Sequence, residues 1–214
     1  MSELTFFSGT MDSGKSTLAL QLDFTLRSSG AEGKRYTRLD RKGDVISSRI
    51  GLAETAHPVT EDMDLYADLA STMPVTYAIC DEAQFYTVEQ IDQLALAVDT
   101  FNIDIYAFGI LTDFTGSMFT GAKRLLEVAD RRLELPVPAR CWCGAKATHN
   151  ARVEHGAMVI SGTVVDPAAT YHVLCRRHYR NRDLGHTFIA HGIEAVGGTT
   201  STLATSPSTT PPHH

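Results

Sequence analysis

The stretch Thr5-Phe-Phe-Ser-Gly9-Thr10-Met11-Asp12-Ser13-Gly14-Lys15-Ser16-Thr17 decides the fold of this chain. The apolar run Leu4–Phe7 predicts a strand that leads into the glycine-bearing loop, and the residues after Ser16 predict a helix. The two glycines are five positions apart and are followed directly by Lys-Ser, which is the spacing of a P-loop. A chance glycine turn with a lysine is the alternative, and the flanking strand and helix disfavour it. The stretch therefore predicts a nucleoside triphosphate site.

The residue types of this loop have a chemical reason. Glycines let consecutive backbone N–H groups turn inward around a polyphosphate, and the following helix N-terminus adds partial positive charge. Lys15 can then reach the outer phosphates, and the hydroxyl of Ser16 can ligate Mg²⁺. We therefore expect residues Gly9 to Ser16 to bind the nucleotide.

Composition limits the classes of function. The chain has 214 residues, of which 43% are hydrophobic and 21% charged, as expected of a soluble globular protein. Its 19 basic and 25 acidic residues give a net charge of −6, which argues against a broad nucleic-acid-binding surface. The basic run Arg176–Arg182 is more typical of a solvated helix face than of a nucleic-acid contact. No apolar run approaches the ~20 residues of a membrane span, and no signal peptide is recognisable, so we expect no membrane partner and a cytoplasmic location.

The first helix is expected over Ser16–Ser28, where apolar residues recur at helical spacing. Lys34–Thr37 is a candidate strand. The polar segment Arg38–Gly51 follows, and five basic groups lie between Arg35 and Arg49. The segment fits a mobile loop beside the phosphates and an ordinary surface loop about equally well.

A second strand, Val75–Cys80, leads directly into Asp81-Glu82-Ala83-Gln84-Phe85. Carboxylates at the end of a buried strand are costly unless they have a role. In P-loop proteins an acid at this place completes the Mg²⁺ site, which suits Asp81. Glu82 can then accept a proton from an attacking hydroxyl. Two acids in an ordinary strand-to-helix turn are the alternative.

The next elements predict the fold class. Val88–Val98 is expected to be a helix and Ile103–Phe108 a strand that ends at Gly109. Strands separated by helices predict an α/β fold, a P-loop NTPase-type parallel sheet with flanking helices. Ligands bind such sheets beyond the carboxyl ends of the strands, so Gly9, Asp81 and Gly109 should converge there. A polar-aromatic loop, Ile110–Gly121, and a helix over about Ala122–Asp130 complete this part.

Beyond a boundary marked by Pro136 and Pro138, two ligand pairs lie about thirty residues apart: Cys141-Trp-Cys143 and Cys175-Arg-Arg-His178. Three thiolates and one imidazole are a ligand set of structural zinc, and free thiols without metal are the alternative. Met158–Ile160 and Thr163–Val165 are expected to be short hairpin strands of a zinc ribbon. We thus expect a nucleotide-binding domain over 1–135, a zinc-ribbon domain over 136–195, and a disordered tail over 196–214 rich in Gly, Thr, Ser and Pro.

Taken together, these residues resemble the type II thymidine kinase family. The P-loop, Asp81–Phe85, Asp113-Phe114 and the Cys/His set occur in the family's order, and the likeness covers about residues 3–185. The C-x-C…C-x-x-H form is similar to the bacterial members. Two positions depart from the commonest pattern, since Asp12 stands where an aromatic residue is frequent and Ala83 where glycine is frequent.

The resemblance implies ATP-dependent phosphorylation of thymidine, with deoxyuridine as a possible second acceptor, at the 5′-hydroxyl. It implies Glu82 as general base, Lys15 as the phosphate-binding lysine, and ATP with Mg²⁺ held in part by Asp81, Glu82, Ala83 and Gln84. It also implies structural Zn²⁺ held by the Cys/His set, and a homotetramer. The nucleoside would be bound by a lasso-like loop and an apolar wall, formed by Gly162, Thr163, Val164, Val165, Asp166, Tyr171, Met11, Phe85 and Phe114.

Two alternatives to this function remain. One is another P-loop nucleoside kinase or NTPase with an added zinc module. The other is a nucleotide-regulated nucleic-acid-binding protein, which the net acidity disfavours.

Overall fold

The computed structural model describes residues 1–38, 44–164 and 169–185 of the chain. Its elements, in chain order, are β1 (Leu4–Ser8), α1 (Lys15–Ser28), β2 (Gly33–Thr37), β3 (Val45–Ser47), β4 (Ala53–Thr55), β5 (His57–Pro58), α2 (Leu65–Ser71), β6 (Tyr77–Cys80), the 3-10 helix η1 (Ala83–Phe85), α3 (Val88–Phe101), β7 (Asp104–Gly109), α4 (Thr120–Val128), β8 (Arg131–Glu134), β9 (His149–Glu154), β10 (Ala157–Met158), β11 (Thr170–Leu174) and α5 (Arg176–Asn181). Within these ranges, the helices are all too short or too polar to span a bilayer.

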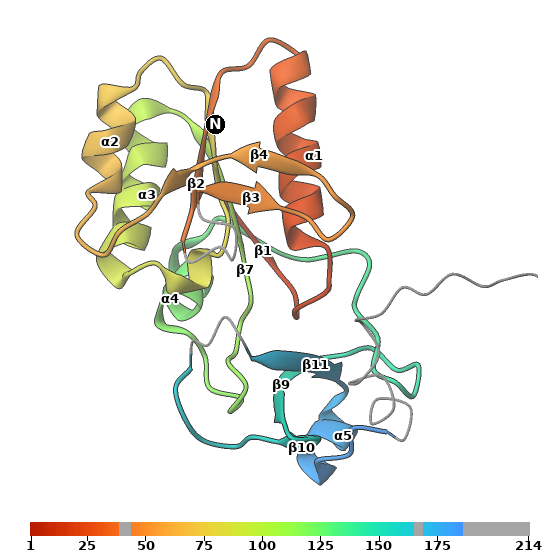
Figure 1. Ribbon diagram of the computed structural model, residues 1–214. Helices are drawn as coiled ribbons and strands as arrows, with labels where there is room; N and C mark the ends of the chain where they lie inside the picture. Colours follow the sequence, from red (N-terminus) through yellow and green to blue (C-terminus); the bar gives the residue numbers. More distant parts are fainter. Residues whose placement is uncertain (39–43, 165–168, 186–214) are drawn as a thin grey trace, which may run out of the picture.

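A six-stranded parallel sheet forms the larger part of the molecule, in the order β5-β2-β6-β7-β1-β8. Parallel neighbours need crossover connections, and helices supply most of them. The α/β prediction is therefore confirmed. Helix α1 and the β3–β4 hairpin lie on one side of the sheet, and α2, α3 and α4 lie on the other (Figure 1).

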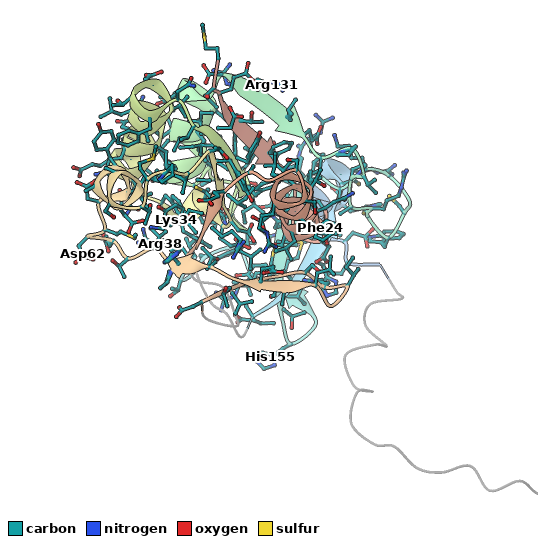
Figure 2. All side chains as sticks on the ribbon, turned by 90° about the horizontal axis from the view of Figure 1, so that it is seen from above. Phe24, Lys34, Arg38, Asp62, Arg131 and His155 are labelled. Atoms are coloured by element: carbon teal, nitrogen blue, oxygen red, sulfur yellow. The ribbon has the colours of Figure 1, made fainter. Side chains whose placement is uncertain are left out.

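Each face of the sheet has its own apolar core. On the α1 face, Ala19 and Leu20 pack with Ile46 of β3 and with Ile79 and Phe108 of the sheet. The opposite face has a larger core that joins β1, β2, β6 and β7 to α2, α3 and α4. Burial on both faces explains why the central strands are almost continuously apolar. The outer side of α1 carries Phe24, which is exposed (Figure 2).

The strand register brings the carboxyl ends of the central strands together. Ser8 of β1 is paired with Gly109 of β7, and Cys80 of β6 is paired with Ala107 of the same strand. The N–H of Gly9 donates to the carbonyl of Gly109 at 3.3 Å. The predicted convergence of Gly9, Asp81 and Gly109 at one edge is thus confirmed.

The smaller part of the molecule lies below that edge (Figure 1). It is an antiparallel sheet in the order β10-β9-β11, packed with α5 over a small core of Cys141, Ala151, Leu174 and Leu184. The predicted hairpin strands Met158–Ile160 and Thr163–Val165 are wrong in position. Met158 ends β10, Thr163 and Val164 lie in a loop, and Val165 lies outside the described residues. The main pairing is instead between β9 and β11, whose register the local sequence does not encode.

Other differences have local causes. The segment expected to be a loop over Arg38–Gly51 contains β3, which forms an antiparallel hairpin with β4. Helix α2 and strand β8 were not predicted, since α2 is short and β8 is a charged edge strand. Helix α4 ends at Val128 rather than near Asp130, because the carboxylate of Asp130 accepts the N–H of Leu4 at 2.8 Å, and this hydrogen bond anchors that residue to the sheet.

Candidate active site

The P-loop connects β1 to α1 in a conformation that depends on its glycines. Gly14 has φ of +82°, a region that side-chain-bearing residues rarely adopt. A Cβ at Gly9 would lie 2.4 Å from the Oγ of Ser13, so any larger residue there would displace Ser13. Asp12 also has a positive φ, of 62°. Backbone with positive φ at some positions and negative φ at others turns successive N–H groups toward one point, as anion-binding loops require.

Lys15 lies inside this loop rather than in solvent. Its side chain is 7% exposed, and its Nζ donates to the carbonyl of Thr10 at 2.8 Å. Burial lowers the pKa of Lys15, while the nearby carboxylates of Glu82, Asp81 and Asp12 act in the opposite direction. A buried ammonium next to a ring of backbone N–H groups is suited to a phosphate oxygen.

Asp81 is fully buried at the end of β6 and faces the P-loop. The hydroxyl of Ser16 donates to its Oδ2 at 2.8 Å. Its other oxygen, Oδ1, has no hydrogen-bond partner among the described residues, although buried polar atoms nearly always have one. Burial, and then the charge of Glu82, raise the pKa of Asp81 to about 7. A buried, unpartnered carboxylate oxygen next to a serine hydroxyl is a fitting donor set for a hard divalent cation.

Glu82 follows Asp81 with φ of 52°, a left-handed conformation that is uncommon for a side-chain-bearing residue. The amide of Gln84 holds it, since its Nε2 donates to Glu82 Oε2. The Oε1 of Gln84 accepts the N–H of Ile110, at the end of β7, at 3.1 Å. Backbone strain clusters at functional sites, so this turn is a candidate for a catalytic carboxylate.

The aromatic residues expected around a nucleoside come from η1, which holds Phe85, and from the loop after β7, which holds Phe114. Phe85 makes an edge-to-face contact with Phe119, with ring centroids 5.3 Å apart. Phe114 is 1% exposed, and the guanidinium of Arg152 lies 5.6 Å from its ring centroid. The hydroxyl of Tyr179 donates to the carbonyl of Phe114 at 2.6 Å. The loop after β7 is therefore fixed by contacts from β9 and α5.

The predicted lasso-like loop is only partly described. Gly162 has φ of +132°, and the carbonyl of Thr163 accepts Arg152 Nη1 at 2.8 Å. Val164 is exposed, whereas Val165 and Asp166 lie outside the described residues. Tyr171 of β11 lies opposite Arg152 of β9 in the strand register. Arg152 thus joins Phe114, the start of the loop and the strand pair.

Asn150 of β9 is a site residue that the sequence analysis missed. Its Oδ1 accepts the N–H of Met11 at 2.8 Å, and its Nδ2 donates to the carbonyl of Thr112 at 3.2 Å. The side chain is 3% exposed. It therefore joins the P-loop to the loop that carries Phe114. Neither Asn150 nor Arg152 belongs to a motif, and the only available signal was a polar residue in an amphipathic strand.

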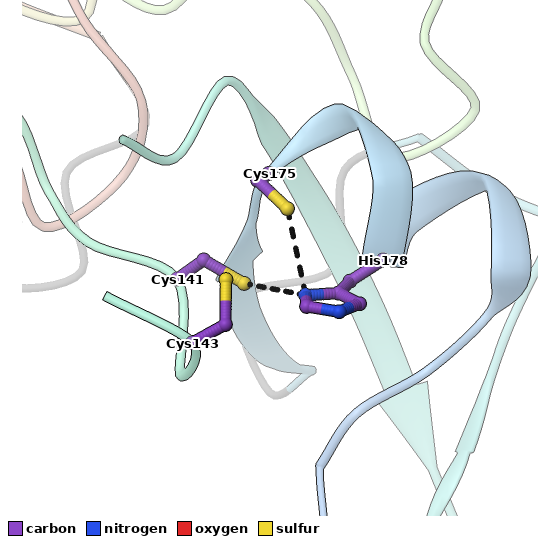
Figure 3. A group of neighbouring side chains, drawn as sticks. All are labelled: Cys141, Cys143, Cys175 and His178. Atoms are coloured by element: carbon purple, nitrogen blue, oxygen red, sulfur yellow. Dashed lines mark hydrogen bonds between the residues drawn. The ribbon is translucent and has the colours of Figure 1, made fainter. Parts of the chain in front are cut away.

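The four predicted metal ligands, Cys141, Cys143, Cys175 and His178, form one cluster (Figure 3). Their ligand atoms all lie within 4.8 Å of one another. The Nδ1 of His178 points at the sulfurs and lies 3.3 Å from Cys141 Sγ and 3.4 Å from Cys175 Sγ. The backbone N–H of His178 lowers the pKa of Cys175, which favours the thiolate. The cluster can hold a metal ion.

The surroundings of the cluster orient the histidine. Trp142 stacks on the ring of His178 with centroids 4.3 Å apart, and the Oδ2 of Asp183 lies 3.9 Å from its Nε2. Such outer partners orient the ring of a metal-binding histidine. Tyr179 follows His178 directly in α5, so the cluster is connected to Phe114 through one residue.

Comparisons with known proteins agree with this geometry. The family model described as "Thymidine kinase" matches residues 2–179. The chain is 50% identical over 192 residues to a thymidine kinase of Cutibacterium acnes, covering 84% of this chain and 89% of that protein. It is 51% identical over 195 residues to a thymidine kinase of Streptomyces coelicolor, covering 85% and 90%. Among solved structures, Pif1 of Bacteroides bound to single-stranded DNA aligns at 14% identity, covering 62% of this chain and 38% of that one, with a TM-score of 0.38, which is too low to support an argument.

Proposed function

Because the chain belongs to the thymidine kinase family, we propose that it transfers the γ-phosphate of ATP to the 5′-hydroxyl of thymidine at the site between the P-loop and Glu82. We assign the catalytic roles to these residues because Ser16, Asp81 and Glu82 lie together at one edge of the sheet. A phosphate donor, a cation and a base are all needed at one place for this reaction.

The P-loop holds the donor in this proposal. Backbone N–H groups from Gly9 to Ser16 surround the β- and γ-phosphates, and Lys15 leaves the carbonyl of Thr10 for a phosphate oxygen. Asp81, Glu82, Ala83 and Gln84 form the wall of the site opposite the loop. Phosphoryl transfer depends mainly on positioning and electrostatics, which this arrangement supplies.

Mg²⁺ is proposed to be held by Ser16 and Asp81, because Asp81 offers a buried oxygen that no group in the described part of the chain contacts by a hydrogen bond. When bound, Mg²⁺ neutralises charge on the transferring phosphoryl group. Glu82 is the proposed general base and accepts the proton of the 5′-hydroxyl. Gln84 orients Glu82 through its amide, which leaves the second carboxylate oxygen available for that hydroxyl.

The acceptor is proposed to be bound by the smaller part of the molecule together with Met11, Phe85 and Phe114. Gly162 to Asp166 would contact the base through backbone groups, and Tyr171 would lie next to it. Arg152 supports this proposal, because it contacts both the carbonyl of Thr163 and the ring of Phe114. A loop that closes over the nucleoside would also exclude water from the transfer.

We also propose that the Cys/His cluster holds zinc, since three thiols and one imidazole prefer it to harder cations. Zinc would cross-link the two ends of the unit that carries the acceptor loop. The division into domains at 1–135 and 136–195 and a cytoplasmic location are proposed from the sequence alone, and a homotetramer is proposed because the family implies it. Sedimentation velocity of the full chain tests the tetramer.

Transfer of label from γ-labelled ATP tests the function. The proposal expects labelled thymidine 5′-monophosphate, with deoxyuridine as a weaker acceptor and none with deoxycytidine or deoxyguanosine. Transfer to another nucleoside alone would favour a P-loop kinase of different specificity. If protein with full metal content hydrolyses ATP but transfers phosphate to none of the nucleosides, the kinase assignment is rejected.

A further inference from the structure

The turn between β3 and β4 places an arginine against the P-loop. Arg49 Nη1 lies 2.6 Å from Asp12 Oδ1. The side chain of Arg49 is 70% exposed and that of Asp12 is 33% exposed. Within the described part of the chain, this is the one ion pair or hydrogen bond of Arg49. Because a guanidinium carries five N–H donors, Arg49 can contact a second anion in addition to Asp12.

Asp12 is an unexpected residue at this place. It puts a carboxylate on a loop whose backbone is arranged for a polyanion, and it does so in a left-handed conformation. Without compensation, that carboxylate would repel the incoming phosphates. Arg49 provides a compensating charge. Asp12 and Arg49 shift the pKa of Lys15 in opposite directions, after the larger effect of burial, so both charges lie within electrostatic reach of the phosphate-binding ammonium.

The turn that carries Arg49 is held in place. The N–H of Ser48 donates to the carbonyl of Leu52 at 2.8 Å, and the N–H of Leu52 donates to Ser48 Oγ at 3.1 Å. Ile46 of β3 is fully buried among residues of α1 and the sheet. At the other strand, Glu54 pairs with Arg27 of α1 at 3.4 Å. The hairpin is thus anchored to the helix that begins with Lys15 and Ser16.

An exposed ion pair of this kind contributes little to folding stability. A guanidinium, by contrast, binds phosphate oxygens in a bidentate manner, and such contacts are among the stronger hydrogen bonds. The position of the pair, at the tip of an anchored turn and beside the phosphate cradle, is therefore better explained by nucleotide binding than by stability.

We propose that Arg49 is a phosphate-binding residue that Asp12 holds beside the P-loop and that transfers to the triphosphate when ATP binds. The inference rests on the proposed use of the P-loop for ATP. In this arrangement the carboxylate of Asp12 keeps Arg49 in place before ATP binds. Once ATP is bound, the larger negative charge of the triphosphate attracts Arg49 more strongly than Asp12 does.

The test is equilibrium titration of Mg-ATP into four proteins: wild type, Arg49→Met, Asp12→Asn and the double variant. We expect Arg49→Met to weaken ATP affinity by about tenfold or more, the loss typical of a charged hydrogen bond. We expect Asp12→Asn to bind ATP at least as tightly as wild type. In the Asp12→Asn background, Arg49→Met should still cause a loss of similar size, larger for ATP than for AMP.

If Arg49 only offsets the charge of Asp12, the effect of Arg49→Met will vanish in the Asp12→Asn background, and the proposal is overturned. Arg49→Lys should recover part of the affinity, because it keeps the charge but not the bidentate geometry. Ile50→Ala, an exposed position on the same turn, is the matched control and should bind ATP as wild type does. A wild type that binds no ATP would instead reject the proposed function.

Discussion

Asn150 uses both ends of its side-chain amide for backbone groups of two different loops. It accepts from Met11 of the P-loop and donates to Thr112 of the loop after β7. A buried side chain with both polar atoms satisfied fixes the distance between those loops. Met11 and Phe114 are both proposed to contact the nucleoside, so their separation sets the width of the acceptor site.

This role predicts the behaviour of Asn150→Leu, which keeps the volume and removes both hydrogen bonds. We expect thymidine affinity to fall by about tenfold or more and stability to fall by about 1–3 kcal/mol, because a buried N–H and a carbonyl lose their partners. Calorimetric titration with thymidine and thermal unfolding measure the two effects. Asn150→Asp, which retains the acceptor for Met11, should lie between wild type and Asn150→Leu. Unchanged thymidine affinity in Asn150→Leu would contradict the role of Asn150 in setting the width of the acceptor site.

At the residue scale, the sequence was most informative where chemistry depends on spacing along the chain. The P-loop, the pair Asp81-Glu82 and the two Cys/His pairs are local patterns, and the structure brings the members of each together. Asn150 instead acts through hydrogen bonds with Thr112 and Met11, which lie about 40 and 140 residues earlier in the chain. Arg152 acts through a hydrogen bond with the backbone of a loop, at Thr163. No local pattern reports such contacts.

Helix α2 is attached to β2 through Asp68, which was not singled out by any motif. Its Oδ2 accepts Lys34 Nζ at 2.5 Å and the hydroxyl of Tyr36 at 2.6 Å. Lys34 is 6% exposed and lies inside the body of the molecule (Figure 2). Burial opposes ionisation of Asp68, but the hydrogen bonds from Lys34 and Tyr36 outweigh it and lower its pKa.

A pH-dependent stability difference follows from this contact. Because the folded state lowers the pKa of Asp68, its stabilisation is present above the unfolded pKa of about 4 and is lost as the pH falls through the folded value. Asp68→Asn should therefore cost about 2 kcal/mol at pH 7, and the gap to wild type should narrow below about pH 4. Urea unfolding across that range measures it. Asp99→Asn, an exposed acid on α3, is the control. A gap that is constant with pH would contradict the assignment.

The Cys/His cluster gives a prediction for the smaller sheet and α5. Cys143→Ser removes one of the four ligands and should abolish stoichiometric zinc, because a closed site needs all four. Thymidine affinity or the yield of folded protein should fall, while soluble protein retains ATP binding through the P-loop. Metal analysis and titration with each ligand measure this.

Cys80→Ala is the matched control, since Cys80 is a buried thiol in the main core and away from the cluster. It should keep the zinc content of wild type. A Cys143→Ser protein that is free of zinc and fully active would contradict a structural role for the metal.

Elements were predictable where the period of apolar residues was clear, as in α1, α3 and the central strands. The hairpin strands of the smaller sheet were misplaced, because Thr163 and Val164 have β-branched side chains but no strand to pair with. Strand β8 was missed because an edge strand with the sequence Arg-Arg-Leu-Glu carries no apolar alternation. In both cases pairing with a distant strand decided the outcome.

At the scale of the molecule, two sheets meet at the carboxyl edge of the larger one. The larger sheet supplies the phosphate cradle and two carboxylates, and the smaller sheet with α5 supports the loops proposed to hold the nucleoside. Both contributions are needed at Glu82, where the proposed donor and acceptor come together. This convergence is the central claim of the proposed mechanism.

Single-turnover transfer of label from γ-labelled ATP to thymidine by Glu82→Gln, beside wild type, tests this claim most directly. ATP and thymidine binding should stay close to wild type, because the amide keeps the shape of the carboxylate. The transfer step should slow by about a hundredfold or more, the typical contribution of a general base. A variant that binds both substrates and transfers phosphate at the wild-type rate would contradict the account.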